Sequence, residues 1–172
     1  MTSALHIVCP HCDSINRVLR ERLREGGKCG SCHRPLFEGR PAALNSVARF
    51  DKHATHSDIP LLADFWASWC GPCRMENPNV VATYQKFRNK NFTVLGVSLD
   101  KARDPWLKAI KDDGLGWTQV SDLKFWYNEV AVKYHIQQIP QNFLIDPNGK
   151  IVGRNLRGPD LQDKLCQLLG CN

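Results

Sequence analysis

The chain of 172 residues lacks the long apolar runs that membrane-spanning segments need, and its first residues contain neither a basic cluster nor the apolar core of a secretion signal. Internal repeats and low-complexity tracts are also missing. Its eight cysteines, about 5% of the chain, are too sparse for a scaffold built from disulfides. We therefore expect a cytoplasmic protein without a membrane partner. In that reducing compartment, paired cysteines serve more often as metal ligands or redox catalysts than as structural bridges.

The length suits one ordinary domain with its own core and one small module, which needs disulfide bonds or a metal ion to stabilise it. Residues 1–40 are rich in Cys, Arg and Gly, whereas the first strong apolar run begins at Pro60. We therefore divide the chain into a four-cysteine module at 1–40 and a larger domain at 41–172. The formal net charge is +6, and the basic run RVLRERLRE fits a solvated, salt-bridged face better than a nucleic-acid site.

Apolar periodicity predicts an α/β fold for the larger part. PLLADFWA and FTVLGVSL are typical of buried strands, and the segment CGPCRMENPNVVATYQKFRNK between them has helical spacing. A strand, a helix and a strand in that order predict a parallel pair with helices covering the sheet. Beyond them we expect a helix capped by Asp104, a strand at WTQV, a helix at NEVAVKYHI and a hairpin around DPNG. The last helix, PDLQDKLCQLLG, should place Leu161, Leu165 and Leu168 on one face.

Two of the three Cys-x-x-Cys pairs, CPHC and CGSC, are separated by 16 residues, which is the spacing of a zinc ribbon. The alternatives to a four-cysteine zinc site are two disulfides, an iron site, a redox dithiol, or a site in which His11 or His33 replaces one thiolate. CPHC is also typical of strongly oxidising disulfide enzymes, but only eight residues precede it, too few for the buried strand that this chemistry needs. The spacing predicts a structural Zn²⁺ held by Cys9, Cys12, Cys29 and Cys32.

The third pair, in WCGPC, lies between a predicted buried strand and a predicted long helix. Cys70 is therefore expected at a helix N-terminus, where unpaired amides and the helix dipole favour the thiolate. Cys73, one turn further on, should be more buried and less reactive. A purely structural disulfide would stabilise little across so short a loop. The context predicts a redox-active dithiol.

At this point the sequence resembles known families. DFWASWCGPCRM resembles the thioredoxin active-site segment, and with CPHC and CGSC the first 76 residues are similar to the zinc-containing thioredoxin two branch. From ENPNVV onward the chain resembles TlpA/ResA-like and peroxiredoxin-related proteins, with an insertion near 101–121. The resemblance implies a thioredoxin fold, a mixed sheet with flanking helices, preceded by a small zinc ribbon. It also implies a protein-disulfide reductase without an organic cofactor, recharged by thioredoxin reductase.

The resemblance also implies roles for individual residues. Cys70 attacks a substrate disulfide, and Cys73 then resolves the mixed disulfide. Asp64 takes the place of the buried acid that accepts the Cys73 proton; the alternative is a surface carboxylate. Thioredoxins pair that acid with a lysine, here replaced by Gly96, so we expect a raised pKa for Asp64. Glu76 is either a second acid or an ordinary first-turn residue.

A substrate groove is implied as well, in which Ile139-Pro140 matches the loop with a cis-proline whose backbone pairs with a bound peptide. The groove residues carried over from the resemblance are Trp69, Gly71, Pro72, Ile139, Pro140 and Gly158.

Two other functions compete with the reductase. The basic zinc ribbon would recruit a partner if the thioredoxin fold were only a carrier, and the peroxiredoxin-like second half suggests a thiol peroxidase. Reactive cysteines of that family follow Thr-x-x, whereas Ala67 stands three residues before Cys70, which disfavours the peroxidase. Four further side chains are expected to have no chemistry: Cys166 in a helix, Cys171 in a frayed tail, and His53 and His56 on a solvated surface.

Overall fold

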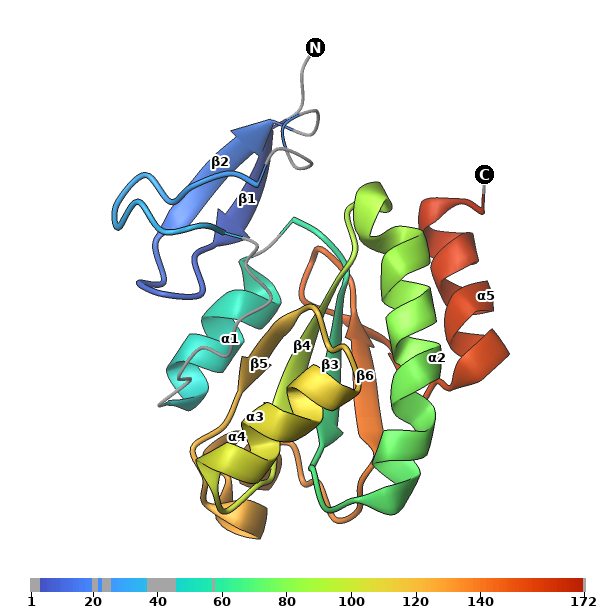
Figure 1. Cartoon of the computed structure of the whole chain (residues 1–172). Helices are drawn as coiled ribbons and strands as arrows, with labels where there is room; N and C mark the ends of the chain where they lie inside the picture. The colour runs from blue at the N-terminus through green and yellow to red at the C-terminus, as the bar shows by residue number, and fades with distance from the viewer. Residues whose placement is uncertain (1–3, 20–21, 23–25, 37–45, 57, 172) are drawn as a thin grey trace.

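A five-stranded mixed sheet forms the centre of the protein. The computed structural model describes residues 4–19, 22, 26–36, 46–56 and 58–171 (Figure 1). β3 is parallel to β4, and β4 to β5, whereas β6 is antiparallel to both β3 and β7. The predicted parallel pair and hairpin are thus confirmed. In sheet order the strands are β5 (Thr118–Val120), β4 (Thr93–Ser98), β3 (Leu61–Trp66), β6 (Gln141–Ile145) and β7 (Ile151–Arg154).

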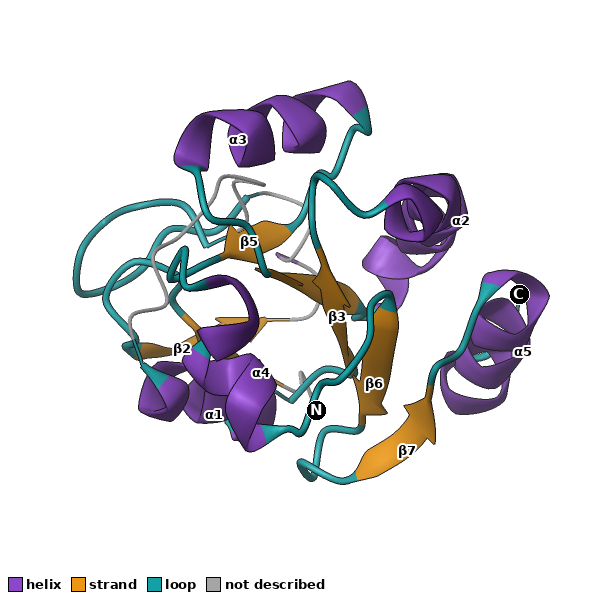
Figure 2. Cartoon of the chain, turned by 90° about the horizontal axis from the view of Figure 1, so that it is seen from below, coloured by secondary structure: helices purple, strands orange, loops and turns teal. Residues whose placement is uncertain are grey.

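Helices cover both faces of this sheet (Figure 2). α1 and α4 pack together on one face, α2 and α5 lie on the other, and α3 lies on the α2 side at the β5 end of the sheet. All six residues of β3 are buried, because a strand covered on both faces needs apolar side chains on both sides. The helices are α1 (Val47–Thr55), α2 (Gly71–Phe87), α3 (Arg103–Asp112), α4 (Glu129–Lys133) and α5 (Gly158–Leu169), with short 3-10 turns η2 (Arg88–Lys90) and η3 (Phe125–Tyr127).

Some local predictions were wrong. The residue that caps α3 is Ala102, and Asp104 lies inside the first turn, where its negative charge still suits the helix dipole. Of the three leucines expected on one face of the last helix, Leu161 and Leu165 are buried, whereas Leu168 is 40% exposed and Leu169 packs against the core instead. α1 was not predicted at all. It begins after Ser46, whose hydroxyl accepts a hydrogen bond from a first-turn amide.

The N-terminal module is an antiparallel hairpin of β1 (Ala4–Val8) and β2 (Ile15–Leu19), followed by an isolated bridge between Lys28 and Pro35. Its own apolar cluster is small, and it shares Ile59 with the larger domain. The predicted division at residue 40 lies outside the described residues. In the part of the chain that the structure describes, no helix combines the length and apolar character needed to cross a membrane.

Candidate redox site and candidate metal site

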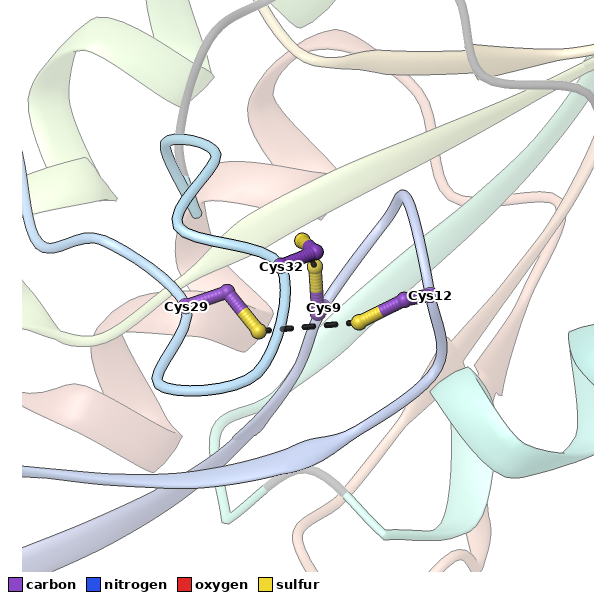
Figure 3. A group of neighbouring side chains, drawn as sticks. All are labelled: Cys9, Cys12, Cys29 and Cys32. Carbon is purple, nitrogen blue, oxygen red and sulfur yellow. Dashed lines mark hydrogen bonds between the residues drawn. The ribbon is translucent and has the colours of Figure 1, made fainter.

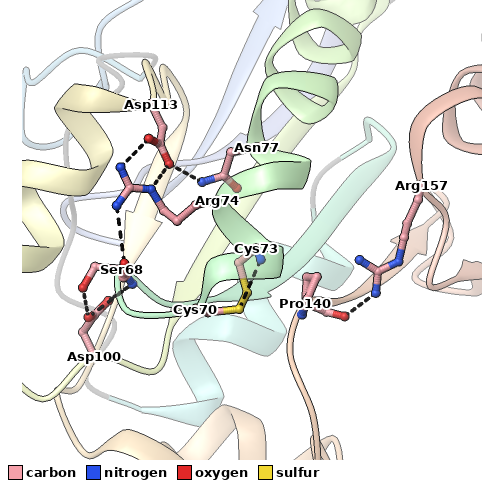
Figure 4. The surroundings of a disulfide bond; sticks show 9 residues. All are labelled: Ser68, Cys70, Cys73, Arg74, Asn77, Asp100, Asp113, Pro140 and Arg157. Atoms are coloured by element: carbon pink, nitrogen blue, oxygen red, sulfur yellow. Dashed lines mark hydrogen bonds and ion pairs between the residues drawn. A yellow bond between two sulfur atoms is a disulfide. The ribbon is translucent and has the colours of Figure 1, made fainter.

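Cys70 and Cys73 form a disulfide at the start of α2 (Figure 4). Cys70 caps the helix, and its Sγ accepts a hydrogen bond from the Cys73 amide at 3.2 Å. Cys70 is 5% exposed and Cys73 only 1%, so the first sulfur is the more accessible one, as the sequence predicted. A sulfur that accepts a hydrogen bond from a helix amide is stabilised as a thiolate when the disulfide is reduced.

A buried carboxylate fixes the loop that precedes Cys70. Asp100, 1% exposed at the end of β4, accepts hydrogen bonds from the Ser68 amide at 3.1 Å and the Ser68 hydroxyl at 2.5 Å. The Ser98 hydroxyl donates to the same carboxylate at 2.6 Å. These bonds hold the turn between β3 and α2 (Figure 4). The sequence analysis missed them, although an aspartate directly after a buried strand is a signal worth following.

A second carboxylate joins α3 to the redox helix. Asp113 accepts from the Arg74 guanidinium at 2.6 Å and from the Asn77 amide at 2.6 Å (Figure 4). Hydrogen bonding to Asp113 raises the pKa of Arg74, which also donates to the Ser68 carbonyl at 3.4 Å. The paired, partly buried charges therefore fix the first turns of α2 against the end of α3. No sequence pattern pointed to this pair, because its members lie far apart in the chain.

Asp64 lies in the middle of β3 and is 5% exposed, which rules out the alternative of a surface carboxylate. Burial raises its pKa to about 7, with a further rise from the negative charge of Glu76 and an opposing effect of Arg157. Gly96 is its neighbour in the β4 register. A Cβ at Gly96 would come within 2.1 Å of the Gln119 Oε1, so the space that a lysine needs is filled.

The loop opposite the redox pair has the expected cis bond between Ile139 and Pro140. Arg157 donates to the Pro140 carbonyl at 2.6 Å, and Pro140 lies among the residues around the disulfide (Figure 4). Glu76 accepts from the Gly158 amide at 3.0 Å. These two bonds tie the cis-proline loop and the start of α5 to the same region as Cys70. The sequence analysis did not anticipate Arg157.

The remaining predicted groove residues are accessible. Gly71 and Pro72 are exposed at the first turn of α2, and Trp69 is 48% exposed directly before Cys70. The Trp69 indole does not project alone, because it packs against the Phe125 ring with the centroids 5.2 Å apart. Their role in substrate binding stays a prediction.

The four cysteines of the N-terminal module converge (Figure 3). Their sulfurs all lie within 4.8 Å of one another, and the pairs that join the two loops are 3.6 Å apart. A tetrahedron with Zn–S bonds of about 2.3 Å has edges of about 3.8 Å, so this donor set fits a zinc ion. All four are thiols rather than disulfides. Neither His11 nor His33 belongs to the cluster found among the described residues.

Both cysteine loops have the same backbone form. Asp13 and His33, each directly after the second cysteine of its pair, have φ of 60°. In both loops this residue's amide donates to the carbonyl of the first cysteine, Cys9 or Cys29. The repeated turn presents two sulfurs on the same side, and two such turns complete the set of four.

Two expectations of inert side chains were wrong. His53 is not on a solvated surface: its side chain is 13% exposed and its Nε2 lies 3.4 Å from the Asp13 carboxylate, while burial lowers its pKa. Cys166 and Cys171 form a disulfide at the C-terminal end of α5. This second bond was missed because Cys166 and Cys171 are five positions apart and form no recognisable motif.

Comparison with known proteins gives two matches along the chain. A model of the AhpC/TSA family matches residues 43–154, more than half of the chain. The chain belongs to the AhpC/TSA family. A second model, described as thioredoxin 2, N-terminal, matches residues 8–34 of this AhpC/TSA protein. The resemblance of the N-terminal part to zinc-containing thioredoxins is thereby confirmed.

The individual relatives include both thioredoxins and ResA-type thiol-disulfide oxidoreductases. Thioredoxin C-3 of Corynebacterium nephridii is 37% identical over 103 residues, which cover 60% of this chain and 68% of that protein. The thiol-disulfide oxidoreductase ResA of Bacillus subtilis is 28% identical over 89 residues, covering 52% of this chain but only 48% of ResA. The chain thus spans about half the length of ResA.

Solved structures agree on the fold. A thiol-disulfide oxidoreductase from Bacteroides fragilis is 42% identical, with a TM-score of 0.62 over 65% of this chain and 82% of that one. The thioredoxin domain of a thiol-disulfide oxidoreductase from Bacteroides vulgatus is 39% identical, with a TM-score of 0.61 over 65% and 80%. The thioredoxin fold is confirmed, and the relatives do not favour a peroxidase.

Proposed function

We propose that this AhpC/TSA protein is a protein-disulfide reductase. The observation that carries the proposal is the Cys70–Cys73 disulfide at a helix N-terminus, with a cis-proline loop beside it. In the reduced protein, the Cys70 thiolate attacks one sulfur of a substrate disulfide and displaces the other as a thiolate. Cys73 then attacks Cys70, which releases the second substrate sulfur. Two electrons pass to the substrate, and the chain returns to the disulfide seen here.

Asp64 is proposed as the group that accepts the Cys73 proton in the second step. A base functions best when its pKa lies near the working pH, and burial brings the pKa of this carboxyl to about 7. Cys70 needs no such base, because the first turn of α2 stabilises its thiolate. The proposed substrate groove consists of Trp69, Gly71, Pro72, Ile139, Pro140 and Gly158.

The metal of the N-terminal module is proposed to be one structural Zn²⁺, bound by Cys9, Cys12, Cys29 and Cys32. Four thiolates close the tetrahedron and leave no position for a substrate, which is typical of structural rather than catalytic zinc. No organic cofactor is included in the proposal. We keep the division into a zinc ribbon at 1–40 and a thioredoxin domain at 41–172, in which α3 and β5 belong to an insertion near 101–121.

For electron transport, thioredoxin reductase is the proposed donor, on the strength of the similarity to thioredoxin C-3. The proposed compartment is the cytoplasm, where reducing conditions keep the four thiols of the zinc site unpaired and would also open the Cys166–Cys171 disulfide. Proteins with accessible disulfides are the proposed partners, and neither membranes nor nucleic acids are included.

Reduction of insulin by NADPH and thioredoxin reductase tests the function. We expect turnover with the wild-type protein and a loss of at least about a thousandfold for Cys70→Ser, because the nucleophile is gone. Cys166→Ser is the matched control: it removes a cysteine of equal size from the other disulfide and should keep activity within about twofold. A wild-type protein that binds insulin without reducing it would leave only the carrier function, and an unchanged Cys70→Ser would refute the site.

A further inference from the structure

Three aromatic rings form a continuous wall beside the reactive disulfide. Trp69, directly before Cys70, packs against Phe125 with a centroid separation of 5.2 Å and against Trp126 at 6.3 Å. Phe125 and Trp126 also contact each other at 5.9 Å. The last two rings come from η3, which lies between β5 and α4. We refer to Trp69, Phe125 and Trp126 as the ring wall.

The ring wall is partly open to solvent although its members are large and apolar. Trp69 is 48% exposed, whereas Phe125 and Trp126 are half-buried and Trp126 also packs against the core. Rings that only stabilise the fold are normally withdrawn into the core, as Phe50 and Phe65 are here, with no exposed area. A partly exposed aromatic cluster next to a reactive cysteine is suited to contact with another molecule.

The backbone that holds the wall is strained. Leu123 and Phe125 have φ of 60° and 58°, in the left-handed region that side chains larger than Asn rarely adopt. Two such residues within three positions destabilise the loop. Backbone strain of this kind is found mostly at functional sites. Phe125, one of these two residues, contacts Trp69.

A cation borders the wall. The Lys101 ammonium lies 4.1 Å from the centroid of the Phe125 ring, a cation–π contact. No carboxylate pairs with Lys101 in the described part of the chain, whereas nearby Lys124 is paired with Glu129 at 2.7 Å. The ammonium therefore remains available to a negative charge on a bound molecule.

These observations bear on the substrates of the proposed reductase. When Cys70 forms a mixed disulfide, the substrate residues next to the attacked sulfur must lie against Trp69, the neighbour of Cys70 in the chain. From the ring wall and its bordering cation, we propose that the protein selects disulfides flanked by an aromatic side chain, with an acidic residue close by. The aromatic side chain packs on the ring wall, and the acid pairs with Lys101. This inference rests on the proposed reductase function.

Single-turnover oxidation of the reduced protein by short cystine peptides tests the selection without any electron donor. Three peptides are compared: one with Ala beside the cystine, one with Phe, and one with Phe followed by Glu. We expect the second-order rate constant to rise at least about tenfold from Ala to Phe, because an apolar ring leaves water. A further gain of about twofold to fivefold for Glu should disappear at high salt.

Variants locate the effect. Phe125→Asn keeps a residue that tolerates the positive φ, and Trp126→Ala removes the second ring; both should bring the Phe-to-Ala rate ratio close to one. Lys101→Gln should remove only the gain from Glu. Tyr127→Ala is the matched control, since Tyr127 is in the same short turn and is 81% exposed but has no ring contact with Trp69 among the described residues. It should keep the full ratio.

The outcomes separate the two proposals. If no peptide oxidises the reduced protein, the reductase function itself fails. If all peptides react at the same rate, or if Tyr127→Ala lowers the ratio as much as Trp126→Ala does, then reduction stands but selection by the ring wall is refuted.

Discussion

The zinc ribbon and the redox helix use the same Cys-x-x-Cys spacing in opposite ways. In the ribbon each pair lies in a tight turn, one between β1 and β2 and the other inside the Lys28–Pro35 bridge, and the partners of its sulfurs come from the other turn, 3.6 Å away. In WCGPC the pair begins α2, so Cys70 receives a helix amide while Cys73 is buried one turn further on. The backbone that follows the first cysteine, rather than the spacing, therefore decides between a metal ligand and a nucleophile.

The disulfide between Cys166 and Cys171 extends the comparison. It lies at the C-terminal end of a helix, where the dipole disfavours a thiolate, and at the far end of α5 from Gly158 (Figure 1). Its sulfurs therefore lack the activation that Cys70 has. We interpret the Cys166–Cys171 disulfide as a structural bond that fixes the end of α5, and we call it the clasp.

The largest effect is expected in the ribbon. Cys29→Ser removes one of four thiolates, so zinc affinity should fall by several orders of magnitude, since the bound metal accounts for most of the stability of so small a module. The expected result is loss of zinc from the purified protein, with the hairpin amides of β1 and β2 exchanging rapidly. Insulin reduction should stay within about threefold of the wild type. If activity falls together with zinc, the two regions do not have separate tasks.

The second effect concerns Asp64 and has a defined pH dependence. Burial raises its pKa to about 7 from the ordinary value of 3.8, so between these values the folded protein binds a proton that the unfolded chain has released. Stability therefore falls as pH rises through this window. Asp64→Asn avoids the loss and should be more stable than the wild type by about 2–4 kcal/mol at pH 8, with little difference at pH 4.

The same variant should resolve the mixed disulfide more slowly while the first attack by Cys70 is nearly unaffected. Chemical denaturation at the two pH values and rapid-quench trapping measure both effects. Glu76→Gln is the comparison variant: it keeps the buried carboxyl but removes a negative charge that raises the pKa of Asp64, so that pKa should fall while the proposed base stays in place. A variant that is less stable at pH 8 and resolves at the normal rate would show that Asp64 is ionised and is not the base.

The smallest effect is expected at the clasp. Cys171→Ser opens a loop of only a few residues, so the oxidised protein should lose about 1–2 kcal/mol of stability. In reducing buffer the difference should vanish, because the wild type then lacks the same bond. Equal stability in both buffers would mean that the clasp does not form in solution.

Periodicity and turn chemistry were sufficient to predict most of the sheet. The apolar run in β3 and the DPNG turn between β6 and β7 predicted those elements because local sequence determines them. α1 was missed because it is short, with nine residues of which only Phe50 and Ala54 are buried, and it depends on packing against the rest of the domain. Tertiary contact, not local propensity, decides such an element.

The residues of the redox site also fall into those that the sequence predicted and those that only the fold revealed. The cysteines of the three Cys-x-x-Cys pairs and the buried Asp64 were identified because a motif, or a polar residue in an apolar strand, marks them. Asp113 and Arg157 were not, because their importance comes from partners far away in the chain, the Arg74 guanidinium and the Pro140 carbonyl. Only the fold brings these groups together, so no spacing rule could indicate them.

Stepwise oxidation of the reduced, zinc-loaded protein tests the separation of the two Cys-x-x-Cys chemistries most directly. One equivalent of a disulfide oxidant is added while zinc release is followed with a coloured chelator, and peptide mass spectrometry locates the bond that forms. The account predicts a Cys70–Cys73 bond with zinc fully retained, because the zinc-bound sulfurs are shielded and Cys70 is the activated thiolate. Release of zinc with the first equivalent, or a first bond within the ribbon, would contradict it.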